Sequence, residues 1–254
     1  MFTYDEICEL DQLCNENEVF AKYVTRLREE NNILLLKVTH EFGNPLTLID
    51  STAQLIDSRY PEVHNIKYWT QLKNDITSLS ELLHNFSNYN YCAKLQIRPI
   101  NLLELIENTV KSFEVVAMEK EISIKIDQLD NPLDCLLMYA CDKVKMRQVL
   151  TNIIKNAFEA TEAGDYIHVD LPTEIVRLEF DGNKREYIKI EISNNGRPLV
   201  ETEQEPLFIP FVSNKLSFGG MGLQIAYKIV CAHNGTITMQ STEKETSFSI
   251  YLPV

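Results

Sequence analysis

The sequence has few of the features that mark membrane-spanning or secreted proteins. Its longest uninterrupted apolar run, residues 135–141, is far shorter than the ~18 residues that a membrane-spanning helix needs. The N-terminus lacks the basic and then apolar segments of a secretory signal. The six cysteines form no CxxC pair, so we expect reduced, structural thiols rather than a zinc site or a disulfide framework. These absences favour a cytoplasmic protein without a membrane span.

Positive charge and glycine are also scarce. The chain has 24 Lys and Arg against 37 Asp and Glu, a net charge of −13, which repels the phosphate backbone of nucleic acids and anionic lipids. We therefore expect no nucleic acid partner. With only eight glycines and 44% hydrophobic residues, the 254 residues suit one large or two modest globular domains.

Two long stretches of helical periodicity occupy the N-terminal part, from Val19 to about Ser58 and from about residue 63 to 91. In the first stretch, a set of mostly apolar residues lies within about 40° of one line along the helix surface, which predicts that this face is buried. Two antiparallel helices cannot cover their own apolar stripes, so we expect the hairpin to pair with a second copy as a four-helix bundle. The stripe of the first helix consists of Leu34, Val38, Phe42, Pro45, Ile49, Thr52 and Ile56.

His40 lies roughly 200° around the first helix from Val38, so we expect its side chain to face solvent. A neutral imidazole offers a nucleophilic nitrogen, and Glu41 places a carboxylate beside it. Pro45 has no backbone N–H to donate to the carbonyl of Glu41, and a proline inside a helix destabilises it by about 3 kcal/mol. Its presence predicts a kink near the histidine. The alternative is a surface histidine without a function.

A second polar group lies in the helix for which Asp142 is the expected N-cap. Asn152 and Asn156 are four residues apart, so both amides project from one face, where a carbonyl oxygen can bind a hard cation such as Mg²⁺. Asparagines inside an otherwise apolar helix are costly unless they have partners. A capping or surface role is the alternative.

From about residue 96 the chain alternates expected helices and strands, which predicts an α/β sandwich. Gly220 and Gly222 precede an apolar helix that includes Leu223, and the free N–H groups of such a helix end bind phosphate. Lys215 can add a positive charge there. His233 is expected to be structural, at the end of this helix. The clearest expected strands are 122–126, 166–171, 175–180, 187–193, 236–240 and 247–252.

Five segments resemble, in order and spacing, the sequence boxes of two-component sensor histidine kinases. His-Glu-x-x-Asn-Pro-Leu-Thr at 40–47 resembles their phosphoacceptor box, and 148–160 resembles the N box of the GHKL ATPase superfamily. Segment 192–199 partly matches the Asp-x-Gly-x-Gly box, 206–215 resembles the F box, and 218–223 resembles the second glycine box. The resemblance covers residues 20–254.

The resemblance implies an α-helical hairpin that forms a dimeric four-helix bundle, followed by an α/β sandwich of the GHKL ATPase type. We expect an N-terminal segment of unknown role at 1–18, the dimerisation and phosphotransfer hairpin at 19–95, and an ATP-binding domain at 96–254. The implied activity is phosphorylation of a histidine by ATP and transfer of the phosphoryl group to an aspartate on the receiver domain of a response regulator.

By the same resemblance, His40 is the phosphorylated residue and Asn44 supports a phosphatase reaction. Glu41 is the third expected catalytic residue, because its carboxylate stands beside the histidine. Asn156 is the expected Mg²⁺ ligand. Asn152 stands where hydrolytic members carry a glutamate that activates water, which implies transfer rather than hydrolysis. The expected nucleotide-binding residues are Asn152, Asn156, Asn194, Gly196, Lys215, Gly220, Gly222 and Leu223, with ATP and Mg²⁺ as cofactors.

Two residues depart from the family pattern. Asn194 replaces the aspartate that accepts the adenine amino group, and Pro198 replaces the second glycine of its box. A neutral hydrogen bond is worth about 0.5–1.5 kcal/mol and a charged one about 1.5–3, so we expect ATP binding to be weakened roughly fivefold to tenfold. The alternative is that a neighbouring side chain or a water molecule restores the contact.

These departures leave three hypotheses. The first is an active histidine kinase, which the retained Asn156, Gly220 and Gly222 favour. The second is a phosphotransferase or phosphatase with a degenerate nucleotide site, for which Asn194 and Pro198 leave room. The third is a non-catalytic scaffold, which the intact segment 40–47 disfavours.

Overall fold

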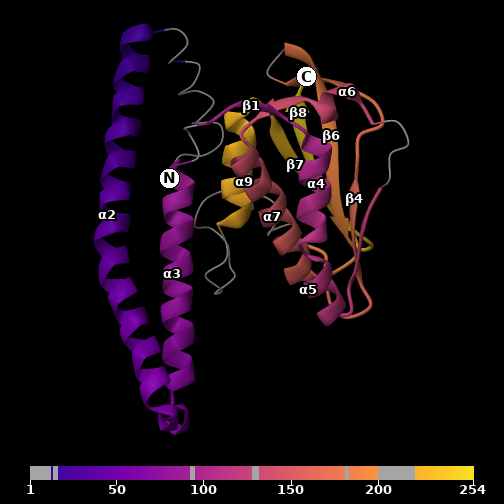
Figure 1. Cartoon of the computed structure of the whole chain (residues 1–254). Coiled ribbons are helices and arrows are strands. Elements are labelled where there is room, and N and C mark those ends of the chain that lie inside the picture. Colours follow the sequence, from indigo (N-terminus) through magenta and orange to yellow (C-terminus); the bar gives the residue numbers. More distant parts are fainter. Residues whose placement is uncertain (1–12, 14–16, 92–94, 128–131, 181–182, 200–220) are drawn as a thin grey trace. The chain divides into compact units, whose positions relative to one another are not determined.

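The computed structural model describes residues 13, 17–91, 95–127, 132–180, 183–199 and 221–254 (Figure 1). The chain divides into two compact units, Met1–Asn90 and Tyr91–Val254. Within the described ranges, no helix combines the length and the apolar character needed to cross a membrane.

The first unit is a hairpin of two long helices. Helix α2 spans Glu18–Arg59, and the side chain of its N-cap residue, Asn17, accepts a hydrogen bond from a backbone N–H of the first turn. A short 3-10 helix, η1 (Pro61–Asn65), forms the turn, and α3 spans Trp69–Tyr91. Helix α3 begins later than the sequence predicted because the residues that follow Pro61 form this separate turn.

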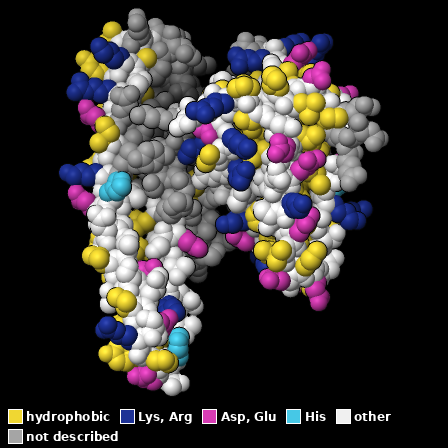
Figure 2. All heavy atoms as spheres, viewed as in Figure 1, with side chains coloured by type: hydrophobic (Ala, Val, Ile, Leu, Met, Phe, Trp, Pro, Cys, Tyr) yellow, Lys and Arg dark blue, Asp and Glu magenta, His cyan; other side chains and the backbone are white. Residues whose placement is uncertain are grey.

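The face of α2 that packs against α3 differs from the predicted stripe. Leu46 and Ala53 of α2 are buried with Ile76 of α3, and Trp69 and Leu83 pack against this cluster. One neighbouring helix covers only part of a helix surface, so the predicted stripe stays exposed in the single chain, and Figure 2 shows hydrophobic side chains on the surface of the hairpin. The exposed members of the stripe include Leu34, Val38, Phe42 and Ile49.

Pro45 does not interrupt α2, which is assigned as one continuous helix. Figure 1 shows a gentle curve along this helix rather than a sharp kink at one residue. A continuous assignment is compatible with a bend, so the kink expected near His40 stays a prediction.

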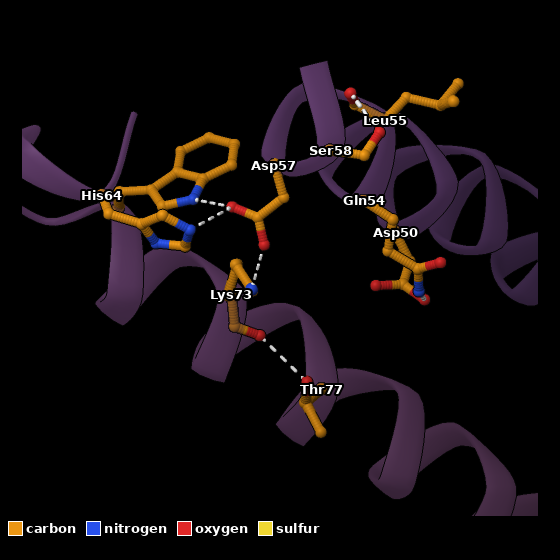
Figure 3. Close-up of polar contacts among 9 residues, drawn as sticks. Asp50, Gln54, Leu55, Asp57, Ser58, His64, Lys73 and Thr77 are labelled. Carbon is orange, nitrogen blue, oxygen red and sulfur yellow. Dashed lines mark hydrogen bonds and ion pairs between the residues drawn. The ribbon is translucent and has the colours of Figure 1, made fainter. Parts of the chain in front are cut away.

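The carboxylate of Asp57 joins the two helices near the turn (Figure 3). Its Oδ1 accepts a hydrogen bond of 2.7 Å from Nε1 of Trp69 and lies 3.6 Å from Nε2 of His64. Its Oδ2 pairs with Nζ of Lys73. The hydrogen bonds from Lys73 and Trp69 hold the pKa of Asp57 below its ordinary value.

The second unit is an α/β sandwich, as the sequence predicted. The order of its main sheet is β2-β4-β6-β8-β7, with β5 added to β6; β2 and β4 are parallel, and the other neighbours are antiparallel. Strands β1 (Arg98–Ile100) and β3 (Tyr139–Cys141), which the sequence did not predict, form a separate pair. The main strands are β2 (Ser123–Ile126), β4 (Tyr166–Asp170), β5 (Val176–Phe180), β6 (Asn183–Asn194), β7 (Thr236–Ser241) and β8 (Thr246–Pro253).

A layer of helices covers one face of this sheet (Figure 1). The helices of this unit are α4 (Leu102–Lys111), α5 (Glu114–Glu119), α6 (Asp134–Leu137), α7 (Lys143–Ala160) and α9 (Gly222–Ala232). Side chains alternate along each strand, so every second residue faces this layer. The row in β6 is Ile188, Ile190 and Ile192, all 0–1% exposed, and Phe248, Ile250 and Leu252 of β8 lie beside it.

Asp142 caps α7 and also connects it to other parts of the unit. One carboxylate oxygen accepts from two backbone N–H groups in the first turn of α7, at 3.0 and 3.1 Å, and the other accepts from Gln96 at 2.8 Å. The backbone N–H of Asp142 donates to Nε2 of His233 at 3.0 Å. Nδ1 of the same ring therefore carries the proton and donates to the carbonyl of Ile229 at 2.8 Å. His233 has the structural role that was predicted for it.

We predict that Asp57→Ala lowers the thermal unfolding midpoint of the hairpin more than Asp57→Asn, because the amide keeps an acceptor for Trp69 but loses the ion pair with Lys73. Asp50→Asn serves as the control, since the Asp50 carboxylate bonds only to Gln54 on its own helix among the described contacts. Circular dichroism at one fixed protein concentration measures these midpoints.

The contribution of the Asp57 carboxylate to the stability of the hairpin depends on pH in a defined direction. Because folding lowers the pKa of Asp57, its contribution is fully present above the ordinary carboxyl pKa and is lost as the pH falls through the lowered value. Equal midpoints for the wild type and Asp57→Ala at pH 7 would contradict this role.

Candidate functional site

The predicted phosphoacceptor residues lie on the exposed surface of α2. His40, Glu41 and Asn44 are all exposed, as the outward position of His40 on the helix predicted. His40 and Asn44 are one turn apart, so their side chains are neighbours on one face. Nearby hydroxyl groups are already engaged: Thr39 and Thr47 each donate to a backbone carbonyl one turn earlier, at 2.8 Å. The imidazole is therefore open to a reaction partner from solvent.

Asn152 connects α7 to the beginning of α9. Its Nδ2 donates to the backbone carbonyl of Gly222 at 2.9 Å, and Gly222 is the first residue of α9. The preceding N-cap residue, Met221, makes no side-chain capping hydrogen bond, so the first N–H groups of α9 have no side-chain cap. Such a helix end suits an anion such as a phosphate group. The half-buried Asn156 follows one turn later on α7, where its amide oxygen could bind Mg²⁺.

Gly196 lies against the C-terminal end of α7. A Cβ atom at this position would lie 2.1 Å from the carbonyl oxygen of Ala160 and 2.6 Å from the carbonyl carbon. The next residue, Arg197, donates its backbone N–H to the same oxygen at 2.8 Å. This close approach fixes the turn that follows β6 onto α7, and only glycine leaves room for it.

Asn194 is the last residue of β6 and is 1% exposed. In the described part of the chain, its buried Nδ2 has no hydrogen-bond partner. An unsatisfied buried donor costs about 1–3 kcal/mol, and an acceptor on a ligand would remove this cost. The adenine base of a nucleotide carries such acceptors on its ring nitrogens, so the residues around α7 fit a nucleotide.

The remaining predicted nucleotide contacts are distributed differently. Lys215 and Gly220 lie outside the described residues, as does the F box at 206–215. The side chain of Leu223 is buried in α9, with 8% exposure, so it offers a ligand only its backbone N–H. Thr246 was not predicted, although the alternation along 246–252 places it on the same sheet face as Phe248 and hence beside Asn194.

A separate polar cluster occupies the opposite face of the sheet. Nε2 of His168 lies 3.0 Å from Oδ1 of Asp127, and its Nδ1 lies 3.6 Å from Oδ1 of Asp170. One ligand atom from each residue lies within 4.8 Å of the others, a spacing that could accept a divalent cation. Burial raises the pKa of Asp170. The alternation in β4 keeps this cluster away from the face that carries Asn194.

Comparison with known proteins gives this arrangement a class. Residues 141–254 match the family of histidine kinase-, DNA gyrase B- and HSP90-like ATPases. The chain is 25% identical over 222 residues to the signal transduction histidine-protein kinase AtoS of Escherichia coli and 28% identical over 225 residues to the sensory histidine kinase/phosphatase NtrB of Vibrio alginolyticus. Both alignments include 87% of this chain, which spans 34% of AtoS and 62% of NtrB.

Solved structures show the same fold. Full-length ShkA in complex with AMPPNP aligns with a TM-score of 0.67 and 22% identity, covering 87% of this chain and 45% of ShkA. The histidine kinase AdeS of Acinetobacter baumannii aligns with a TM-score of 0.54 and 18% identity, covering 79% of this chain and 93% of AdeS. The C-terminal unit is thus an ATPase fold of the GHKL type. Over 87% of its length the chain is similar to signal-transducing histidine kinases, and residues 141–254 match the ATPase family that is named for them.

We predict that Gly196→Ala destabilises the C-terminal unit by about 1–3 kcal/mol, because the added methyl group forces the Ala160 backbone to move. Gly222→Ala is the matched control for stability, since its Cβ would lie 3.5 Å from the Asn152 side chain, an ordinary contact. Urea unfolding followed by circular dichroism measures both variants. A Gly196→Ala variant as stable as Gly222→Ala would show that the turn yields without cost.

Proposed function

We propose that the protein is an ATP-dependent histidine kinase that phosphorylates His40 and passes the phosphoryl group to an aspartate of a response regulator receiver domain. The observation that carries this proposal is the hydrogen bond from Asn152 to Gly222, which joins α7 to the start of α9, where no side chain caps the helix. The similarity of the chain to histidine kinases supports the same proposal. The exposed position of His40 supports its role as acceptor.

In the proposed reaction, a ring nitrogen of His40 attacks the γ-phosphorus of ATP. The nitrogen–phosphorus bond forms, the bond to the bridging oxygen breaks, and ADP leaves. Glu41 directly follows His40 in the sequence, and its negative carboxylate would stabilise the positive charge that develops on the imidazole. Bound Mg²⁺, for which Asn156 is the proposed ligand, would neutralise phosphate charge.

A second function rests on Asn44. Its exposed amide lies one helical turn beyond His40 and can hold a water molecule against a phosphoaspartate docked over this face. The relative NtrB is described as a kinase/phosphatase, and we extend that dual activity to this chain as a proposal. Dimerisation through the hairpin belongs to the same proposal, since a second copy would cover the exposed stripe of α2.

We predict that incubation with γ-labelled ATP and Mg²⁺ places acid-labile, alkali-stable label on the wild type and none on His40→Ala. The control variant His64→Ala keeps the label, because His64 lies at the turn beside Asp57. Autoradiography after acid and alkali treatment distinguishes phosphohistidine from phosphoserine and phosphoaspartate. Label that persists in His40→Ala would overturn the assignment of the acceptor.

We predict that Asn44→Ala leaves autophosphorylation within about twofold of the wild type but slows regulator dephosphorylation by at least about tenfold, because only the return reaction needs a positioned water. The substrate is any receiver domain that has accepted label from His40, and the assay follows loss of that label. Gln54→Ala, another exposed polar change on α2, should alter neither rate. Equal losses of both activities in Asn44→Ala would reject a separate role for the amide.

A further inference from the structure

A row of paired residues crosses the sheet next to Asn194. Ile167 of β4 pairs with Asn194, Asn194 pairs with Thr246 of β8, and Thr246 pairs with Ser241 of β7. Directly opposed residues of antiparallel strands share one face, so all four side chains lie on the face that carries the core. Asn194 and Thr246 are 1% and 3% exposed. This row therefore places polar groups at one end of an otherwise apolar layer.

The amide of Asn194 contains both a donor and an acceptor, and its donor is unused. Nδ2 is buried without a partner in the described ranges of the chain. An aspartate at this position would offer only acceptors, whereas an asparagine can exchange its two ends by rotation of the amide. Because no described group accepts a hydrogen bond from Nδ2, either the oxygen or the nitrogen of the Asn194 amide can face a ligand.

The hydroxyl group beside Asn194 can also reverse its role. Oγ1 of Thr246 lies 2.7 Å from Oγ of Ser241, and either atom can be the donor. Ser241 in turn accepts the backbone N–H of Leu199 at 3.0 Å. If Ser241 donates to Thr246, the Thr246 hydroxyl can donate to a ligand; in the opposite arrangement its oxygen can accept. The Asn194 amide and the Thr246 hydroxyl are therefore both uncharged, and each can act as a hydrogen-bond donor or as an acceptor.

The purine bases differ at the edge that such groups would contact. Adenine presents an amino donor next to a ring-nitrogen acceptor, while guanine presents a carbonyl acceptor next to an N–H donor. A carboxylate placed to accept from the adenine amino group would face the carbonyl oxygen of a guanine bound in the same position and repel it. An amide can make two hydrogen bonds to adenine in one orientation and two to guanine after its oxygen and nitrogen exchange places.

We propose that Asn194 makes the nucleotide site accept guanine as well as adenine nucleotides. This inference rests on the proposed function, because it assumes that the base lies against the row of Asn194 and Thr246. It identifies Asn194 as a residue that determines base selectivity. A site built to bond one base edge rejects the wrong edge strongly, and the neutral amide removes that rejection.

The test compares the dissociation constants of ADP and GDP, each with Mg²⁺, by calorimetry on the full chain. We expect a GDP to ADP ratio below about tenfold for the wild type, a measurement that needs no variant. Asn194→Asp should raise the ratio by at least about tenfold, by tightening ADP binding and weakening GDP binding. Thermal unfolding checks that this variant is folded.

Asn195→Asp provides the matched control. It makes the same change in charge one residue away, and it keeps the side-chain oxygen that accepts the Tyr166 backbone N–H at 2.6 Å. Its GDP to ADP ratio should equal that of the wild type. A wild type that binds ADP and excludes GDP would overturn the inference about the base and leave the kinase proposal intact. Failure of the folded wild type to bind either nucleotide would overturn both.

Discussion

The C-terminal unit depends on the interactions of Asp142. Burial by itself would raise the pKa of this carboxyl group, but hydrogen bonds from the backbone N–H groups of Gln96 and of the first turn of α7 lower it overall. The backbone N–H of Asp142 is bound by the neutral ring of His233, which directly follows α9. One residue thus fixes the N-terminal end of α7 relative to the C-terminal end of α9. With that junction set, Asn152 in the middle of α7 meets Gly222 at the opposite end of α9.

The hairpin is organised by a weaker set of contacts. Its described core is a small cluster around Leu46, Ala53 and Ile76, and the Asp57 carboxylate joins the helices at the turn. A hairpin with so small a core gains stability when a second copy covers its exposed apolar stripe. The same exposure suits the proposed role of His40, which lies on the surface of α2 and is not covered by any described side chain. The hairpin must keep its proposed reactive residue exposed, whereas the proposed binding residues of the sandwich are largely buried.

Local signals in the sequence predicted much of this structure. Asp142 was predicted to begin a helix, and it does so because its carboxylate accepts hydrogen bonds from free N–H groups only two and three residues away. Alternation and helical period likewise predicted the sandwich. Contacts between distant residues were not predictable in this way: the bond from Asn152 to Gly222 spans 70 residues, and the close approach of Gly196 to Ala160 depends on how β6 meets α7. Periodicity revealed an apolar stripe on α2 but not which partner covers it, so Leu46 and Ala53 were missed.

In the proposed function, Asn152 links the fold around the nucleotide site to the choice between phosphoryl transfer and hydrolysis. Its donor is engaged by the carbonyl of Gly222, so the amide is held by the backbone at the start of α9. An amide oxygen is too weak a base to remove a proton from water, and this side chain therefore cannot activate water as a carboxylate would. In the proposed site, the residue that contacts the start of α9 would therefore not promote loss of the γ-phosphate to water. Under the proposed function, a nucleotide bound there would keep its phosphoryl group until a stronger nucleophile arrives, and the exposed imidazole of His40 is the proposed one.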